Sequence, residues 1–413
     1  IGQVGYQQLG VHLNYDQELS NAWRMGYAVG YDMTDYERLL LNKVNLDNRQ
    51  TSHQEDNYFA RILTHWTPDD RFSLAVGFEF NRNEYGLRSP DFPDKAPSSA
   101  QFEEGMPRWH TQTRSALVDT HWYINGHWTA FFSARLDKHT FSEPEASPRF
   151  ALVNTPTDQD TVKLILSRSN LLSYADSIKK THDAGSGDIA TETLDNIELR
   201  YERNHSSQLF SAISVYHQQI EAIGYDFVAN KNVIVGEQEQ AGTELELSFR
   251  GENVQLGLSH QYHNLIDFEL GPTTKATFVT AAPYDFGNDL DSWSNHISKV
   301  DLTYRLNDRW RTHGNLQYLW KFDGMGDQVA YRNSTLAEDA QRTEPGWDDT
   351  FKKSVFLNLG IECKPSKHYT INLIGYHLLG LIDKDLNKQN YLGGFGGYRN
   401  LAPSIGIDIS WTP

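Results

Sequence analysis

Few residues of this sequence have the types and spacing that chemistry requires. His260 and His263 are the nearest to a metal-ligand pair, but residues i and i+3 of a strand point to opposite faces, which disfavours a shared metal site. Cys363 is the single cysteine and follows an alternating apolar series, so a structural thiol on an apolar face is favoured. The glycine-rich stretch 393–397 has no following helix, which favours a flexible loop over a phosphate cradle.

Catalytic motifs are absent from the rest of the sequence. We find no G-x-S-x-G nucleophile elbow, no H-E-x-x-H pair, no P-loop and no dinucleotide fingerprint between a strand and a helix. No nucleophile and base stand at a spacing that would bring them together. We therefore expect no enzyme, no catalytic residue, no metal site and no cofactor.

Charged residues that alternate with apolar ones are the other candidates for function. In 72–80, five apolar residues occupy every second position, and Glu79 stands among small residues in between. The same alternation recurs through the chain and puts charged side chains on one face of each expected strand. The charged residues that we single out are Arg24, Glu79, Asp119, Arg135, Glu244, Glu246, Arg250, Asp301 and Arg311.

This period of two predicts an all-β fold of about seventeen strands. Many of the strands are about 10 residues or longer, the length that a tilted strand needs to cross a bilayer, whereas strands of soluble proteins average about 5–6 residues. The only helix candidate is 170–182. The expected strands are 4–16, 22–33, 57–67, 71–84, 109–124, 127–141, 149–156, 160–169, 194–204, 207–219, 241–250, 253–265, 295–306, 309–322, 352–363, 367–379 and 402–412.

The connections between these strands alternate between short and long. The short ones are turn-like, such as the Asn-Gly pair at 125–126. The long ones are expected at 34–56, 85–108, 170–193, 220–240, 266–294, 323–351 and 380–401. Long loops on one rim, short turns on the other and aromatic residues near strand ends are typical of an outer-membrane β-barrel. The alternative is a soluble β-sandwich or propeller, but no blade-length repeat is visible.

Composition narrows the class of protein further. The chain has 413 residues and a net charge of −17, and its mean hydropathy is −0.60. No run of about 18 apolar residues occurs, which excludes a helical membrane protein. A single cysteine excludes an internal disulfide, an aromatic content of 12% argues against disorder, and the acidic charge argues against nucleic acid as a partner.

Several segments in order resemble the TonB-dependent outer-membrane receptors. Residues 147–152 read Ser-Pro-Arg-Phe-Ala-Leu and are similar to the mid-barrel S-P-R-x-A-L hairpin of that family. The segment 192–202 resembles the strand that follows, and 242–247 resembles the G-x-E-x-E strand. The segment 376–384 lies where the family has its last hairpin. The resemblance covers about 145–413 by motif and the earlier part by architecture.

The resemblance implies a 22-stranded transmembrane antiparallel β-barrel with an N-terminal plug domain. We interpret 1–413 as a single outer-membrane barrel domain, the C-terminal portion of a receptor barrel, without the plug and about five strands. The short turns follow the odd-numbered strands, so the first strand runs toward the periplasm, whereas a barrel of even strand number begins with an upward strand. A chain that starts at Ile1 is expected to be mature or trimmed, and the true C-terminus is expected beyond Pro413.

The resemblance implies transport in the bacterial outer membrane. We expect a TonB-dependent receptor for a scarce nutrient: siderophore-bound iron, cobalamin, another metal chelate or a glycan. The implied partners are outer-membrane lipid and lipopolysaccharide, the TonB complex acting through a plug, and the small-molecule ligand. The lumen-facing charged residues would contact a plug or line an aqueous path. Loop aromatics that could contact the ligand are Tyr284, Trp293, Tyr331 and Trp347.

Two alternative functions stay open at this point. One is a plugless porin or export channel of 16 or 18 strands, which would conduct ions. The other is a barrel that acts as a structural partner in a complex, where a second chain supplies the missing strands.

Overall fold

The computed structural model describes 2–41, 48–86, 108–173, 175–185, 189–226, 231–271, 280–290, 293–335, 352–390 and 398–412. In chain order the strands are β1 (Gly2–Ser20), β2 (Trp23–Leu41), β3 (Asn48–Asp69), β4 (Phe72–Tyr85), β5 (Trp109–Tyr123), β6 (Trp128–His139), β7 (Glu145–Asn154), β8 (Asp160–Leu172), β9 (Thr191–Asn204), β10 (Leu209–Asp226), β11 (Lys231–Arg250), β12 (Val254–Leu270), β13 (His296–Arg305), β14 (Trp310–Trp320), β15 (Lys353–Ser366), β16 (Tyr369–Tyr376), β17 (Lys388–Asn390), β18 (Tyr398–Asn400) and β19 (Ser404–Trp411). The helices are α1 (Ala175–Asp183), α2 (Asp323–Thr335) and the 3-10 turns η1 (Ala282–Tyr284), η2 (Leu378–Leu381) and η3 (Lys384–Asn387).

Within these described residues, seventeen strands, β1–β16 and β19, belong to one antiparallel sheet, and β17 and β18 pair separately. Each of the seventeen corresponds to one strand expected from the sequence, so the fold class is confirmed. A search of the described helices for one long and apolar enough to cross a membrane finds none.

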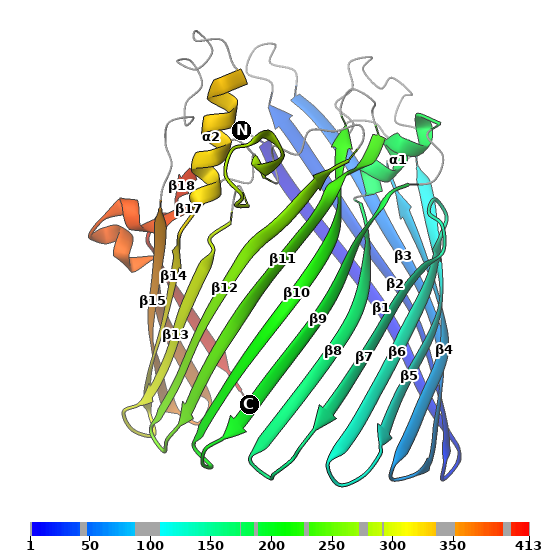
Figure 1. The fold of residues 1–413 in the computed structure, drawn as a ribbon, viewed down its shortest axis with the longest axis horizontal. Coiled ribbons are helices and arrows are strands. Elements are labelled where there is room, and N and C mark those ends of the chain that lie inside the picture. The colour runs from blue at the N-terminus through cyan, green and yellow to red at the C-terminus, as the bar shows by residue number, and fades with distance from the viewer. Residues whose placement is uncertain are drawn as a thin grey trace. The chain divides into compact units, whose positions relative to one another are not determined.

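The chain divides into two compact units, of which the first comprises 1–152, 167–193 and 223–233. In this unit β1 to β6 form consecutive antiparallel pairs, each strand bonded to the next along the chain. Helix α1 lies at the end of the strands away from the short turns (Figure 1). The helix ends where Gly185 adopts a φ of 70°, a left-handed conformation that glycine takes without steric cost.

The second unit comprises 153–166, 194–222 and 234–413. Here β11 to β16 and then β19 pair antiparallel in chain order. The turn from β13 to β14 is closed by Asn307, whose Oδ1 accepts hydrogen bonds from the backbone N–H groups of Arg309 (2.9 Å) and Trp310 (3.0 Å). Helix α2 lies at the opposite end of these strands from such turns (Figure 1).

In the described strands, apolar side chains are spread over one face and are not gathered in a central core. In the first unit Phe78 is 63% exposed, and in the second unit Leu302 is 44% exposed. The buried apolar clusters among the described residues are small; one of them joins Trp109, Ile178 and Ile189 of the first unit. Apolar faces left open to this extent require an apolar medium such as lipid to cover them.

The prediction of a long loop is wrong for two segments. The segment expected as a loop at 34–56 is mostly strand, because β2 and β3 stay paired out to Leu41 and Asn48. The segment at 220–240 is likewise mostly covered by β10 and β11. Apolar alternation weakens in both segments, but backbone hydrogen bonds continue the strands without it.

Helices were predicted unevenly. The helix candidate 170–182 is confirmed only from Ala175, where α1 begins, because 170–172 belong to β8. Helix α2 lies in a segment that we expected to be loop. The sequence of α2 contains two glycines and no clear apolar stripe, so local pattern does not reveal it.

Candidate functional site

All nine charged residues singled out from the sequence lie in strands, on the face opposite the apolar one. Each occupies the alternate phase to outward apolar neighbours, as Glu79 does between Phe78 and Phe80. The first unit contributes Arg24, Glu79, Asp119 and Arg135, and the second unit contributes Glu244, Glu246, Arg250, Asp301 and Arg311. That this polar face lines a lumen stays a prediction.

Arg135 joins three strands of the first unit. The strand register places Glu79 opposite Ser115 and Ser115 opposite Asp137. From β6, Arg135 Nη2 donates to Glu79 Oε1 (2.8 Å) and to Ser115 Oγ (2.7 Å), and Nε donates to Asp137 (2.8 Å). Two carboxylates thus share one guanidinium through charge-assisted hydrogen bonds, which tie β4, β5 and β6 together on this face.

Arg200 holds a second network, in the second unit. Its two terminal nitrogens donate to the two carboxylate oxygens of Glu246, both at 2.9 Å, although β10 lies between their strands. Arg200 Nε donates to Glu202 Oε1 (2.7 Å), which also accepts from Lys163 Nζ (2.7 Å). The network therefore links β8, β9 and β11. Of its four members only Glu246 was singled out from the sequence.

The other charged residues of the second unit differ in their contacts. Asp301 Oδ1 accepts a hydrogen bond from Asn315 Nδ2 (2.7 Å). Arg311 forms an ion pair with Glu362 at 3.6 Å. Within the described parts of the chain, no ion pair joins the side chain of Glu244 or Arg250, nor those of Arg24 and Asp119 in the first unit.

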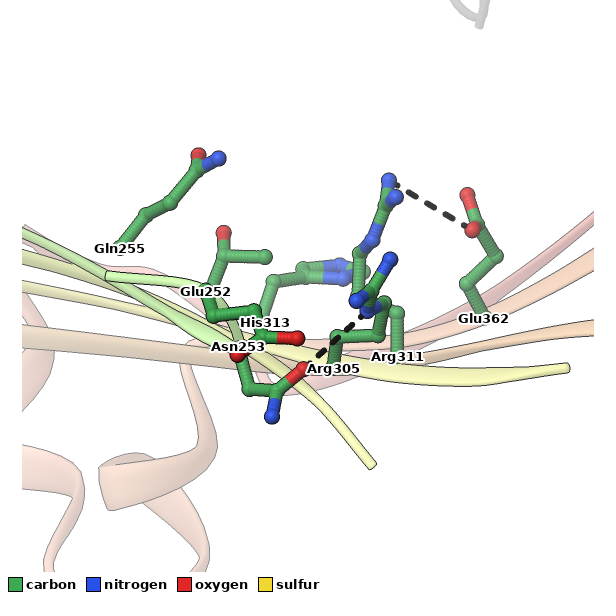
Figure 2. A pocket seen from close by; sticks show the side chains of 8 residues that line it. Glu252, Asn253, Gln255, Arg305, Arg311, His313 and Glu362 are labelled. Atoms are coloured by element: carbon green, nitrogen blue, oxygen red, sulfur yellow. Dashed lines mark hydrogen bonds and ion pairs between the residues drawn. The ribbon is translucent and has the colours of Figure 1, made fainter. Parts of the chain in front are cut away.

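A polar cavity of about 360 Å³ opens on this face of the second unit, at the short-turn end of the strands. Figure 2 shows the side chains of Arg305, Arg311 and Glu362 rising from it on the same side of the strands. The lining residues are Glu252, Asn253, Gln255, Thr303, Arg305, Arg311, His313 and Glu362. No sequence motif indicated this cavity, because it depends on the register of β12 to β15.

Three of the four loop aromatics proposed as ligand contacts are described by the structure. The rings of Tyr284 and Tyr331 pack against each other, with their centroids 4.5 Å apart. Phe286 packs edge-on against Tyr331, with a centroid distance of 5.6 Å. Tyr331 is buried, so its ring anchors α2 to the loop at 280–290. Trp293 is 56% exposed and touches His263 edge-on. Trp347 lies outside the described residues.

The attachment of α2 also involves a carboxylate with a shifted pKa. Asp327 lies so close to Gly287 that a Cβ built there would stand 1.8 Å from Asp327 Oδ2, and Gly287 has a φ of 64°. Burial, together with the nearby carboxylates of Asp289 and Asp323, raises the pKa of Asp327 above its ordinary value of 3.8.

This shift predicts that α2 is held more tightly at acidic pH. A raised carboxyl pKa means that the folded protein binds the proton more strongly than the unfolded chain, so stability falls as pH rises through the window above 3.8. Hydrogen-exchange protection factors of the α2 amides should decrease across that window. Asp327→Asn should remove the dependence and Asp308→Asn, in the β13–β14 turn, should not; an unchanged profile in Asp327→Asn would contradict the assignment.

His260 and His263 lie in β12, and Cys363 lies in β15. The ring of His260 forms a hydrogen bond with Ser298 Oγ (2.8 Å) and lies beside the ring of His296. His260 and His263 are on opposite faces of β12. Cys363 is opposite Trp310 and Ile371, in the apolar phase as expected. Among the described residues no group of three or more His, Cys, Asp or Glu side chains could hold a metal ion.

This strand architecture is shared with a known protein family. A family model described as TonB-dependent receptor-like, β-barrel, matches residues 2–376. The chain belongs to this family. Its members lie in the outer membrane of Gram-negative bacteria, and this outer-membrane localisation explains the exposed apolar faces of the strands. No curated protein matches the sequence.

Solved structures of TonB-dependent receptors share the fold at low sequence identity. The siderophore receptor PirA from Acinetobacter baumannii has 12% identity and a TM-score of 0.69, with 98% of this chain and 62% of that one covered. The FrpB iron transporter from Neisseria meningitidis has 13% identity and a TM-score of 0.66, covering 98% and 62%. The copper transporter OprC has 14% identity and a TM-score of 0.67, covering 98% and 65%. The chain thus spans less than two thirds of the length of these receptors.

Proposed function

We propose that this chain is the wall of a TonB-dependent importer for a scarce nutrient. The observation that carries the proposal is the family match over residues 2–376. Charged networks on the polar face, centred on Arg135 and Arg200, support it because they suit a wall around a polar interior. Ligand capture would occur at the long loops, and release would depend on a plug domain remodelled by the TonB complex.

A metal-bearing ligand is favoured among the nutrients considered. The similar structures are named for a siderophore, iron and copper. We propose Trp293 and Tyr284 as the loop aromatics to examine first, since Trp293 is exposed and Tyr284 only partly buried, whereas Tyr331 is buried. Trp347 stays a proposal outside the described residues.

Uptake by cells tests this function. Cells that express the full-length protein under iron or copper limitation should accumulate the labelled metal chelate, and this uptake should disappear in a strain without TonB or after collapse of the proton-motive force. Cells that express residues 1–413 alone should show no TonB-dependent uptake, because we assign the energised step to the plug. Energised uptake by residues 1–413 alone would contradict that assignment.

Conductance separates import from the channel alternative. An importer with its plug in place should stay nearly silent in a planar lipid bilayer. Large, steady ion conductance by the full-length protein, together with uptake that is independent of TonB, would replace the proposal by a porin.

A further inference from the structure

Two arginines face each other at the short-turn end of the polar face. Arg305 of β13 and Arg311 of β14 are direct cross-strand partners. Their neighbours along the chain, Tyr304 and Trp310, are exposed on the apolar face. Because successive side chains point to opposite faces, both guanidinium groups project from the polar face of the sheet. Like charges directly opposite each other destabilise an antiparallel pair unless an anion lies between or beside them.

In the part of the chain that the structure describes, too little negative charge lies beside this pair. Glu362 is opposite Arg311, at 3.6 Å from its Nη1, but it is shared with Lys364 Nζ at 3.5 Å. Among the residues that the structure describes, the side-chain partner of Arg305 Nε is the neutral Asn253 Oδ1, at 3.3 Å. Even with Glu252, which lines the cavity, three cationic side chains stand against two carboxylates.

The space around the two guanidinium groups has room for an anion. The cavity measures about 360 Å³, and a water molecule occupies roughly 30 Å³ of liquid, so a carboxylate or phosphate fits with several waters. His313 forms one side, and its ring crosses Gly360 so closely that a Cβ there would lie 2.0 Å from Nε2. Gln255 and Thr303 add neutral hydrogen-bonding groups. Figure 2 shows both guanidinium groups on the open side of the strands.

We propose that this cavity binds an oxyanion between Arg305 and Arg311. Guanidinium groups recognise carboxylate and phosphate in a planar, two-bond geometry, and a pair of them on neighbouring strands can hold one oxyanion from two directions. The oxyanion is either free inorganic phosphate or the carboxylate of an acidic polypeptide segment that lies against the polar face. This site is independent of the proposed import function, so failure of one leaves the other standing.

Binding to the purified full-length protein in detergent tests the site. Inorganic phosphate is titrated by ³¹P NMR, and an acetylated tetraglutamate peptide is titrated by calorimetry. Binding of phosphate alone identifies a free anion, and binding of the peptide alone identifies a polypeptide carboxylate. Binding of both supports the shared chemistry, and binding of neither overturns the proposal.

Variants separate the site from general electrostatic attraction. Arg305→Gln and Arg311→Gln should each weaken binding about tenfold, because each removes a charge-assisted pair of hydrogen bonds. Arg309→Gln removes the same charge from the neighbouring exposed turn and should leave affinity within about twofold. Equal weakening in Arg309→Gln would overturn the proposal.

Glu362→Gln provides a test in the opposite direction. This carboxylate competes with the bound anion for Arg311, so its neutralisation should strengthen binding severalfold while the strands stay intact. Arg305→Lys keeps the charge but loses the fork of donors, and should weaken binding less than Arg305→Gln. Loss of binding in Glu362→Gln, with heat-modifiable electrophoretic mobility showing a folded barrel, would also overturn the proposal.

Discussion

Replacing Arg200 by methionine is expected to lower the free energy of unfolding by about 2–3 kcal/mol, somewhat less than the loss of a fully buried ion pair. The side chain of Arg200 is 17% exposed, and it is the common partner of Glu202 and Glu246. Among the described residues, its removal leaves these two carboxylates on the polar face with Lys163 as the remaining cation of the network. Because Glu246 is 34% exposed, water recovers part of the lost interaction.

Denaturant unfolding in lipid vesicles, followed by tryptophan fluorescence, measures this loss. A double-mutant cycle with Glu246→Gln should give a coupling energy of about 1–2 kcal/mol, since the two residues share two hydrogen bonds. Arg250→Met is the matched control, an arginine at the turn end of the same polar face, and should change stability by less than about 0.5 kcal/mol. An equal loss in both variants would show that charge alone matters and that the geometry of the network does not.

The strands were predictable from the sequence because lipid imposes a simple rule. Where one face must be apolar and the other polar, every second residue is constrained, as in Phe72–Phe80 and Trp310–Trp320. The rule ends at the membrane surface. Residues of β2 and β3 near Leu41 and Asn48 are still paired through their backbones, but their sequence does not show the alternation that would reveal a strand.

The candidate site was predictable only in part, for a related reason. Alternation shows that Glu246 and Arg311 lie on the polar face, but it does not show which side chains they meet. Those partners depend on register between strands: Arg200 reaches Glu246 across β10, and Arg305 stands opposite Arg311 only because the β13–β14 turn sets their pairing. Register follows from turn geometry and from packing along whole strands, which single-strand patterns do not contain.

Leu316→Arg is expected to cost about 2–4 kcal/mol of folding free energy in vesicles, because the side chain lies on the apolar face near the middle of the membrane span. Leu316 is paired between Val300 and Leu357, and Trp310 and Trp320 stand at the two ends of β14. Those tryptophans are expected at the two membrane interfaces. An arginine midway between them can reach neither headgroup region without bending the bilayer.

Gln317→Arg is the matched control, one residue along the same strand but on the polar face between Lys299 and Phe356. It should cost about 1 kcal/mol or less, because the polar face does not impose the loss of hydration that lipid imposes. The like charge of Lys299, directly opposite, adds only a few tenths of a kcal/mol to this cost. Thr312→Arg lies on the same face as Leu316 but closer to the turn, and its cost should be intermediate. A penalty that depends on depth is specific to lipid, since a protein core would penalise both apolar-face positions according to their burial alone. Equal costs at Leu316 and Gln317 would therefore contradict the assignment of the two faces, and with it the wall that the import function requires.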